Sequence, residues 1–314
     1  MSRVSGPKSS SRGTWLVPLS LLLATGALLG ISTNLAKLAA EAGLNPLAFL
    51  SWSVVGAAVV LMGISAFRHR LPPLTGRAAE YYMVAGFVGV AAPNLLFFAA
   101  IPHIGAGFVA LTISLPPLLT YLGALALGME QFRARRALGV VLALSGAALL
   151  AVLKLSQPDA DTLWIAAALL GSVLLAVGNL YRTARWPKGA TPDELAPGML
   201  AASALMLLAV GVFVGVFPET PGGFSLTVPT SRAAPLLLIV AQTVTFSLQF
   251  LLFFVLQQRG GPVYLSLLGS VGAIVGVPIA VLLLGEAVPQ GLALGGTLIA
   301  LGIGFLTFRG AKAP

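Results

Sequence analysis

The sequence contains no cysteine, and only 9% of its 314 residues are charged. The absence of cysteine excludes disulfide bonds, thiol nucleophiles and cysteine-ligated metals. Soluble domains carry about 25% charged residues, so a chain this poor in charge cannot cover a water-facing surface. Hydrophobic residues make up 58% of the chain. We therefore expect most of the surface to face lipid.

Several motifs that mark chemistry are also missing. The sequence has no Walker loop and no Gly-x-Ser-x-Gly, and its two histidines do not cluster. These absences argue against an ATPase, a serine hydrolase and a metal site. We expect no enzyme activity, no cofactor and no metal. The net charge of +9 is scattered over short connections, so nucleic acid is not an expected partner.

Long apolar runs dominate what is present. A helix needs about 20 apolar residues to cross the hydrocarbon core. Runs of this length fall near 15–36, 46–67, 80–101, 106–128, 135–153, 163–181, 195–217, 235–257, 262–284 and 290–308. The first run is longer than the apolar core of a signal peptide, so we interpret it as an uncleaved helix. The sequence predicts an all-α membrane protein with ten transmembrane helices.

The basic residues alternate from one connection to the next. If the N-terminus lies inside, only Lys37, Lys154 and Arg232 fall outside, and all other Lys and Arg fall inside. Such a bias sets the orientation of membrane proteins. It predicts a multi-pass protein of a bacterial-type inner membrane with both termini in the cytoplasm.

The two halves of the sequence resemble each other. With a shift of 156 residues, Leu95-Leu96-Phe97-Phe98 falls on Leu251-Leu252-Phe253-Phe254, and Gly105 falls on Gly261. With a shift of 145, Asn34-Leu35-Ala36-Lys37 falls on Asn179-Leu180-Tyr181-Arg182. Because each half has an odd number of helices, the second repeat should enter the membrane from the opposite side. Inverted repeats are a recurring design of secondary transporters.

These observations predict the domain boundaries. We expect a disordered cytoplasmic tail at 1–14, a first five-helix repeat at 15–153, an external linker at 154–162, a second five-helix repeat at 163–308 and a cytoplasmic tail at 309–314.

The positions shared by the two halves resemble the ten-helix EamA branch of the drug/metabolite transporter superfamily. The first helix carries Gly30 and Lys37, and Pro46 opens the second. The end of each half carries a glutamate followed by two spaced glycines: Glu130, Gly139 and Gly146, then Glu286, Gly295 and Gly302. The resemblance covers roughly residues 15–308. It implies efflux or exchange of small solutes, often amino acids and related metabolites.

Neutral polar groups and helix breakers occur near the middle of the predicted helices. Helix breakers at similar depth in both halves point to a transporter binding site. The breakers are Pro93, Pro116, Pro117 and Pro278. The candidate substrate-binding residues are Asn94, Gln249, Ser114, Tyr121, Ser247, Ser270, Phe97 and Phe98.

Each of these residues also has a structural interpretation. Serine and threonine often bond to their own helix, and the phenylalanines could serve packing or lipid contact. An unpaired amide in lipid costs several kcal/mol, so we expect Asn94 and Gln249 to face the interior.

The charged residues at helix ends are expected to be structural. A glutamate at a helix C-terminus opposes the helix dipole, so Glu130 and Glu286 should have partners and lock the repeats; Arg133 or Arg136 could serve Glu130. Lys37 and Arg182 close their helices, where cations are favourable. We find no charge near the centre of any span, which argues against a cationic substrate held by a buried carboxylate.

The predicted function is secondary transport of small metabolites, with amino acids or related zwitterionic solutes as the favoured class, by alternating access. Transport of drugs, vitamins or nucleosides is the alternative. A passive channel and an integral membrane enzyme are less favoured. The expected partners are a small-molecule substrate and membrane lipid, and the protein is expected to be a monomer or a homodimer.

Overall fold

The computed structural model describes residues 16–129, 131–156, 161–216, 226–228, 233–266, 268–288 and 290–307. Throughout this part the regular structure is helical, with no strand. The elements are α1 (Leu16–Glu41), α2 (Pro46–Phe67), α3 (Gly76–Gly86), η1 (Phe87–Ala91), α4 (Ala92–Ile104), α5 (Ala106–Thr112), α6 (Pro116–Ala126), α7 (Ala134–Leu155), α8 (Thr162–Ala184), α9 (Pro192–Val216), α10 (Ala233–Ser266), α11 (Leu268–Pro278), η2 (Ile279–Leu283) and α12 (Leu292–Thr307), where η denotes a π-helical segment.

These elements group into ten helical runs in the described residues. The third run consists of α3, η1 and α4, the fourth of α5 and α6, and the ninth of α11 and η2. Seven runs are long and apolar enough to cross a membrane, and the last two contain shorter apolar helices. The predicted all-α membrane fold is confirmed.

Proline and capping side chains explain where the helices begin and bend. Pro46 opens α2, and the Asn45 side chain accepts a hydrogen bond from the Leu47 amide at 3.0 Å, as expected of an N-cap. Pro93 lacks an N–H and cannot donate to the carbonyl four residues earlier. The backbone there widens into the π turn η1, so the third run is helical on both sides of a break.

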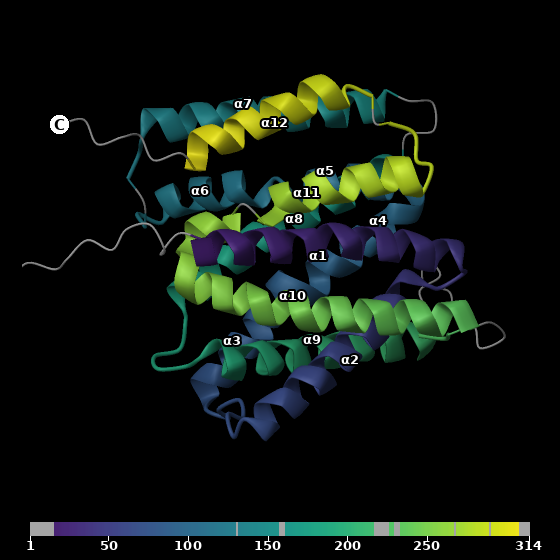
Figure 1. Cartoon of the computed structure of the whole chain (residues 1–314), viewed down its shortest axis with the longest axis vertical. Helices are drawn as coiled ribbons and strands as arrows, with labels where there is room; N and C mark the ends of the chain where they lie inside the picture. The colour runs from purple at the N-terminus through teal and green to yellow at the C-terminus, as the bar shows by residue number, and fades with distance from the viewer. Residues whose placement is uncertain are drawn as a thin grey trace, which may run out of the picture.

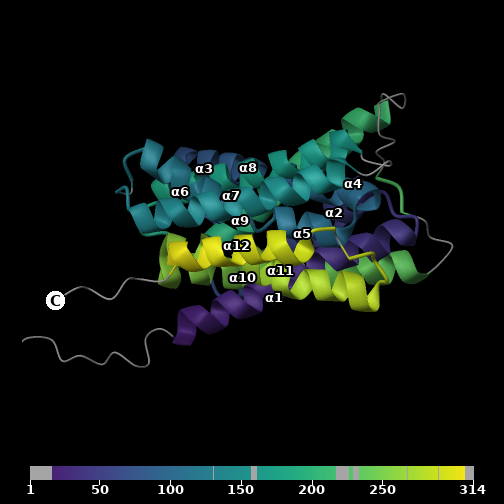
Figure 2. The same ribbon diagram turned by 90° about the horizontal axis from the view of Figure 1, so that it is seen from above.

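The helices are arranged as Figure 1 shows, with α7 and α12 together at one edge and α2, α3 and α9 at the opposite edge. The view from above in Figure 2 also shows α7 and α12 as neighbours. The helix α1 packs against α10 and α11, and α8 packs against α4 and α6. The helix α2 packs against α9, and α7 against α12.

The same pairs of neighbours are found when each helix is replaced by its counterpart in the other predicted half. The exchange replaces α1 with α8, α10 with the run from α3 to α4, and α11 with α5 and α6. The contacts of α1 with α10 and α11 then become the contacts of α8 with α4 and α6, both of which occur. The opposite membrane orientation of the two halves stays a prediction.

Four glycines from the predicted repeat pattern lie in the contact between α7 and α12. A Cβ atom added to Gly146 would lie 2.5 Å from the Gly295 carbonyl oxygen, and one added to Gly302 would lie 2.4 Å from that of Gly139. Small residues of this kind let two membrane helices approach closely. We call this contact the glycine seam.

One helix end differs from the sequence prediction. The eighth and ninth spans were expected to be separate, with the ninth beginning at 262. Instead α10 continues to Ser266 and α11 begins at Leu268. Although proline is common in the first turn of a helix, Pro262 lies within α10 and does not begin a new helix. Glu130 lies outside the described residues.

Candidate functional site

The main cavity among the described residues lies between the two predicted halves. It encloses about 660 Å³ of space, including its open mouth. Its wall consists of Leu29, Gly89, Asn94, Phe97, Ile113, Pro116, Pro117, Leu175, Asn179, Arg182, Gln249, Phe250, Phe253, Leu268 and Gly269.

Both predicted halves contribute to this wall. The first half supplies residues from α1, η1, α4 and α6, and the second supplies residues from α8, α10 and α11. The cavity therefore lies where relative movement of the halves would change its shape.

Five of the sequence-predicted residues line the cavity: Asn94, Phe97, Pro116, Pro117 and Gln249. The Asn94 side chain donates a hydrogen bond to the Val90 carbonyl oxygen at 2.7 Å, so the π turn supplies its acceptor. Gln249 is 9% exposed, and its Oε1 atom is buried without a hydrogen-bond partner. Gln249 therefore has an unused acceptor at the cavity wall. A buried hydrogen-bonding group left without a partner is costly.

The predicted serines lie outside the cavity wall. The Ser114 hydroxyl donates to the Leu111 carbonyl at 2.6 Å, and the Ser247 hydroxyl donates to the Thr243 carbonyl at 2.7 Å. Both contacts are of the structural kind that serine makes within its own helix. The Ser270 hydroxyl is buried and unpartnered, one residue from Gly269 in the wall.

Two aromatic candidates also pack elsewhere. The Phe98 ring contacts the rings of Phe49 and Phe246, with centroids 5.7 and 6.2 Å away. The Tyr121 hydroxyl accepts a hydrogen bond from the Arg133 amide at 3.3 Å, and the Arg136 guanidinium lies 5.7 Å from its ring centroid. These contacts give both rings a structural role.

The remaining helix breakers flank the two π turns. Pro93 is buried in the first turn of α4, directly after η1. Pro278 ends α11, directly before η2. Short π-helical segments such as η1 and η2 are rare and often occur at functional sites. The segment η1 brings Gly89 to the cavity wall.

Sequence reasoning missed Arg182, the one charged residue among the described residues of the cavity wall. Arg182 was expected to stabilise a helix end, and no charge was expected inside the protein. Instead it is 2% exposed and is one of the residues that line the cavity. The correction has a physical origin, because an arginine near the end of an apolar run usually extends to the membrane surface. Here the side chain turns into the protein.

The guanidinium of Arg182 is only partly satisfied. One terminal nitrogen donates to Asn179 Oδ1 at 2.7 Å, and the Phe253 ring centroid lies 4.9 Å from Cζ. The Nε atom is buried without a partner. No carboxylate pairs with it in the part of the chain that the structure describes.

The energies of these contacts can be compared with the cost of burying the Arg182 guanidinium. Burial of a charged group costs several kcal/mol even after relaxation. A hydrogen bond to a charged group contributes about 1.5 to 3 kcal/mol, and a desolvated cation–π contact about 2 kcal/mol. These two contacts offset only part of the cost, and a negatively charged group in the cavity would offset the rest.

Two glycines make room for this guanidinium. A Cβ atom on Gly89 would lie only 1.9 Å from Nη1 of Arg182. A Cβ atom on Gly178 would lie 3.0 Å from Cα of Gly89, so α8 and η1 approach closely through both glycines. The arginine position therefore depends on the absence of a side chain at Gly89.

A separate contact joins the halves beyond the cavity. The Glu286 carboxylate accepts hydrogen bonds from the amides of Ala106 and Gly107 at 2.7 and 2.9 Å. Its Oε1 atom lies 3.2 Å from Lys37 Nζ, which also donates to the Leu284 carbonyl at 3.2 Å. We call this set of contacts the outer clasp, because the charge pattern predicts this end to be external.

The backbone before α5 is shaped for the outer clasp. Gly105 has a φ of 85°, a conformation that favours glycine. A Cβ atom there would lie 3.1 Å from Glu286 Oε2. Lys37 is eight residues beyond Leu29 of the cavity wall, which is about 12 Å along α1 at 1.5 Å per residue. The outer clasp and the cavity therefore lie at different depths.

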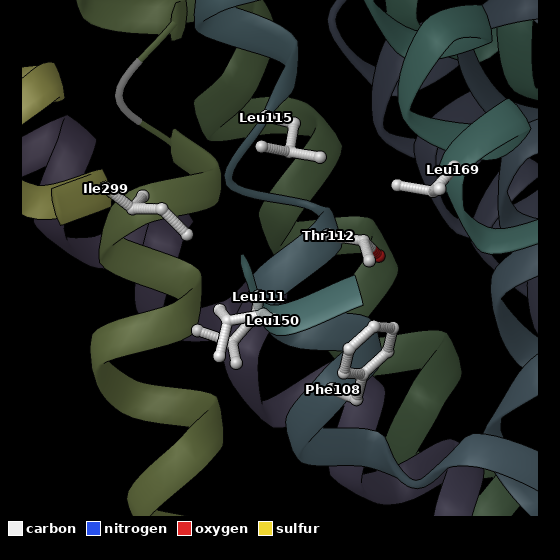
Figure 3. Close-up of a pocket in the computed structure, with 7 residues that line it drawn as sticks. All are labelled: Phe108, Leu111, Thr112, Leu115, Leu150, Leu169 and Ile299. Carbon is white, nitrogen blue, oxygen red and sulfur yellow. The ribbon is translucent and has the colours of Figure 1, made fainter. Parts of the chain in front are cut away.

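A smaller cavity of about 240 Å³ lies between α5, α7, α8 and α12. Figure 3 shows its seven wall residues, of which only Thr112 carries a side-chain oxygen. That hydroxyl already donates to the Val109 carbonyl at 2.8 Å. The wall lacks an unused polar group among these residues, so the main cavity is the better candidate for a polar solute. The described residues contain no group of three His, Asp or Glu that could hold a metal.

Comparisons with known proteins agree with the fold. Residues 16–152 match the sequence model of the EamA-like transporter family. Two WAT1-related proteins of Arabidopsis thaliana are 24% and 23% identical to this chain; the alignments cover 90% and 96% of this chain, and 87% and 90% of those proteins. One solved crystal structure superposes with a TM-score of 0.62 at 18% identity, covering 95% of this chain and 98% of that chain. At this identity the structural likeness supports the fold alone.

Proposed function

We propose that this chain, whose residues 16–152 match the EamA-like transporter family, moves small metabolites across the membrane by alternating access. The favoured substrates are amino acids or related zwitterionic solutes. The protein is a multi-pass membrane transporter, and the expected location is a bacterial-type inner membrane.

One observation carries this proposal: the described residues that line the main cavity come from both predicted halves. Its wall combines amide side chains, aromatic rings and prolines that interrupt helices. Such a wall can hold both the polar and the apolar part of a small solute. In transporters built from repeats, the substrate site lies at the interface between the repeats.

The outer clasp supports alternation between two states. It holds Lys37 and the start of α5, from the first half, against Glu286 of the second half. Its carboxylate bonds would be lost if the halves separated at that end. Cycling between a clasped and an unclasped state would expose the cavity to each side of the membrane in turn.

The test is solute uptake by the purified full chain in proteoliposomes. The panel consists of labelled neutral, aromatic and charged amino acids, with and without a pH gradient. Uptake above that of empty liposomes is expected for at least one class, and its response to the gradient separates exchange from proton coupling. If no amino acid moves while the protein remains folded, the amino-acid assignment is wrong.

A matched pair of variants ties uptake to the cavity. Gln249→Leu removes an amide from the cavity wall and should abolish uptake. Gln257→Leu makes the same change in the same helix at another buried glutamine that does not line the cavity, and it should leave uptake in place. Equal uptake by both variants would remove Gln249 from the site.

A further inference from the structure

The charge of the main cavity favours one chemical class of solute. Of the fifteen described wall residues, Arg182 is the only charged one. Among these described residues there is no aspartate or glutamate to balance the guanidinium or to bind a cation. An isolated buried positive charge in a solute cavity selects a single negative charge on the solute. Intramembrane charges of this kind commonly mark substrate pathways.

The geometry of the arginine favours a carboxylate. A guanidinium is planar and presents parallel donors that match the two oxygens of a carboxylate. One donor of Arg182 is occupied by Asn179, and Nε is buried without a partner. Asn179 and Phe253 hold the group at the wall, so its position is fixed before a solute arrives.

The other described wall residues indicate which further groups the solute should carry. Phe97, Phe250 and Phe253 supply rings on which an apolar body can pack. Gln249 Oε1 has no partner and can accept a hydrogen bond from an N–H or O–H group. Since the described wall residues include no carboxylate that could pair with a solute ammonium, the solute does not require an amino group.

We propose that Arg182 anchors the carboxylate of the transported solute, and that the solute is a monocarboxylate with an apolar body about the size of a ring. The inference deepens the proposed transport function and rests on it, because it assigns the substrate class of the same cavity. It makes the carboxylate, rather than the amino group of an amino acid, the feature that is recognised.

Three probes with the same ring test this assignment. Phenylalanine carries a carboxylate and an ammonium, 3-phenylpropanoate only the carboxylate, and phenethylamine only the ammonium. Binding to the purified full chain would be measured by titration calorimetry near pH 7. Both carboxylates should bind about tenfold or more tightly than phenethylamine, as expected of a charge-assisted pair.

Variants at two arginines locate the anchor. Arg182→Gln should weaken binding of both carboxylates by about tenfold or more. Arg185→Gln removes the same charge at an exposed position three residues away and should leave binding within about twofold. A purely structural role for Arg182 would not change the ranking of the three probes, so the ranking separates a binding role from a folding role.

A second variant keeps the test decisive if Arg182→Gln does not fold. Gly89→Ala retains the arginine but places a methyl group where Nη1 lies. It should weaken the carboxylates by about tenfold and bring their affinity close to that of phenethylamine. The proposal is overturned by unchanged carboxylate binding in either folded variant, by a preference of the wild type for phenethylamine, or by failure of both carboxylates to bind the folded wild type.

The outcome is distinguishable from failure of the transport function itself. Carboxylate binding that depends on Arg182, without uptake into proteoliposomes, would retain the anchor and reject transport. Uptake of amino acids that is unchanged in Arg182→Gln would retain transport and reject the anchor.

Discussion

Replacing Glu286 with glutamine removes one negative charge from the outer clasp. The carboxylate receives two backbone amides and pairs with Lys37, and the glutamate and lysine side chains are only 13% and 15% exposed. A glutamine has nearly the same shape but presents one N–H group where an oxygen was. One of the two amides then loses its acceptor, and Lys37 loses its negatively charged partner in the second half.

The structure gives the size of this effect. A hydrogen bond to a charged group contributes about 1.5 to 3 kcal/mol. Loss of one such bond and of the ion pair should cost about 2 kcal/mol or more, since both groups are largely shielded from solvent. In the proposed alternation these contacts exist only in the clasped state. Its population relative to the unclasped state should therefore fall about 30-fold, at 1.4 kcal/mol per factor of ten.

The absence of cysteine makes this shift measurable. A single Leu29→Cys substitution places a thiol in the cavity wall beneath the outer clasp. A membrane-impermeant maleimide, added outside intact cells, reaches this thiol only when the outer end opens. Labelling should be up to about 30-fold faster in the Glu286→Gln background than in the background with Glu286 intact.

Glu41→Gln provides the matched control. Glu41 also lies near Lys37, at 3.7 Å, but its side chain is 56% exposed and belongs to the same helix. Exposed ion pairs contribute little, so labelling should stay unchanged. The reasoning is refuted if Glu286→Gln folds without faster labelling, or if Glu41→Gln accelerates labelling equally.

Three further predictions concern the seam, the cavity and the topology. Gly302→Ala should destabilise the protein by about 1 to 3 kcal/mol through overpacking, because a Cβ atom there would lie too close to the Gly139 carbonyl oxygen. Thermal unfolding would measure this, with Gly63→Ala as the control. Nothing lies within 4 Å of the Cβ at Gly63 and alanine favours a helix over glycine, so this change should not destabilise the protein. Asn94→Leu should abolish uptake at normal expression, whereas Ser247→Ala should not, and equal uptake by the two would remove Asn94 from the site. Reporter tags on both ends of the chain should report a cytoplasmic location, and one external end would contradict the ten-helix topology.

The sequence predicted the helices well because the bilayer imposes a length and a polarity that are visible residue by residue. It also predicted that Asn94 and Gln249 face the interior, where both line the cavity, since an amide within an apolar run must find a polar environment. Periodicity could not separate Phe97, which lines the cavity, from Phe98, which packs on Phe49 and Phe246. Neighbouring residues on a helix point about 100° apart, and only the packing of other helices decides which one faces the cavity.

Arg182 was missed because its position in the chain has two physical meanings. Near the end of an apolar run, an arginine can extend to the membrane surface or turn inward. One available signal was Gly178, one turn before it, together with Gly89 in the third span. Two glycines in apolar helices permit close approach, but sequence alone does not reveal that they meet each other and this guanidinium.

The glycine seam also has a consequence for biosynthesis. Roughly 140 residues separate the end of α7 from the start of α12, so at 5 to 20 residues per second α7 waits about 7 to 28 s for its partner. Until then its small-residue face lacks α12, its main partner. The first half therefore cannot complete its packing alone. If the chain were cut into two pieces at the linker, the pieces should be degraded when made separately and should reassemble when made together.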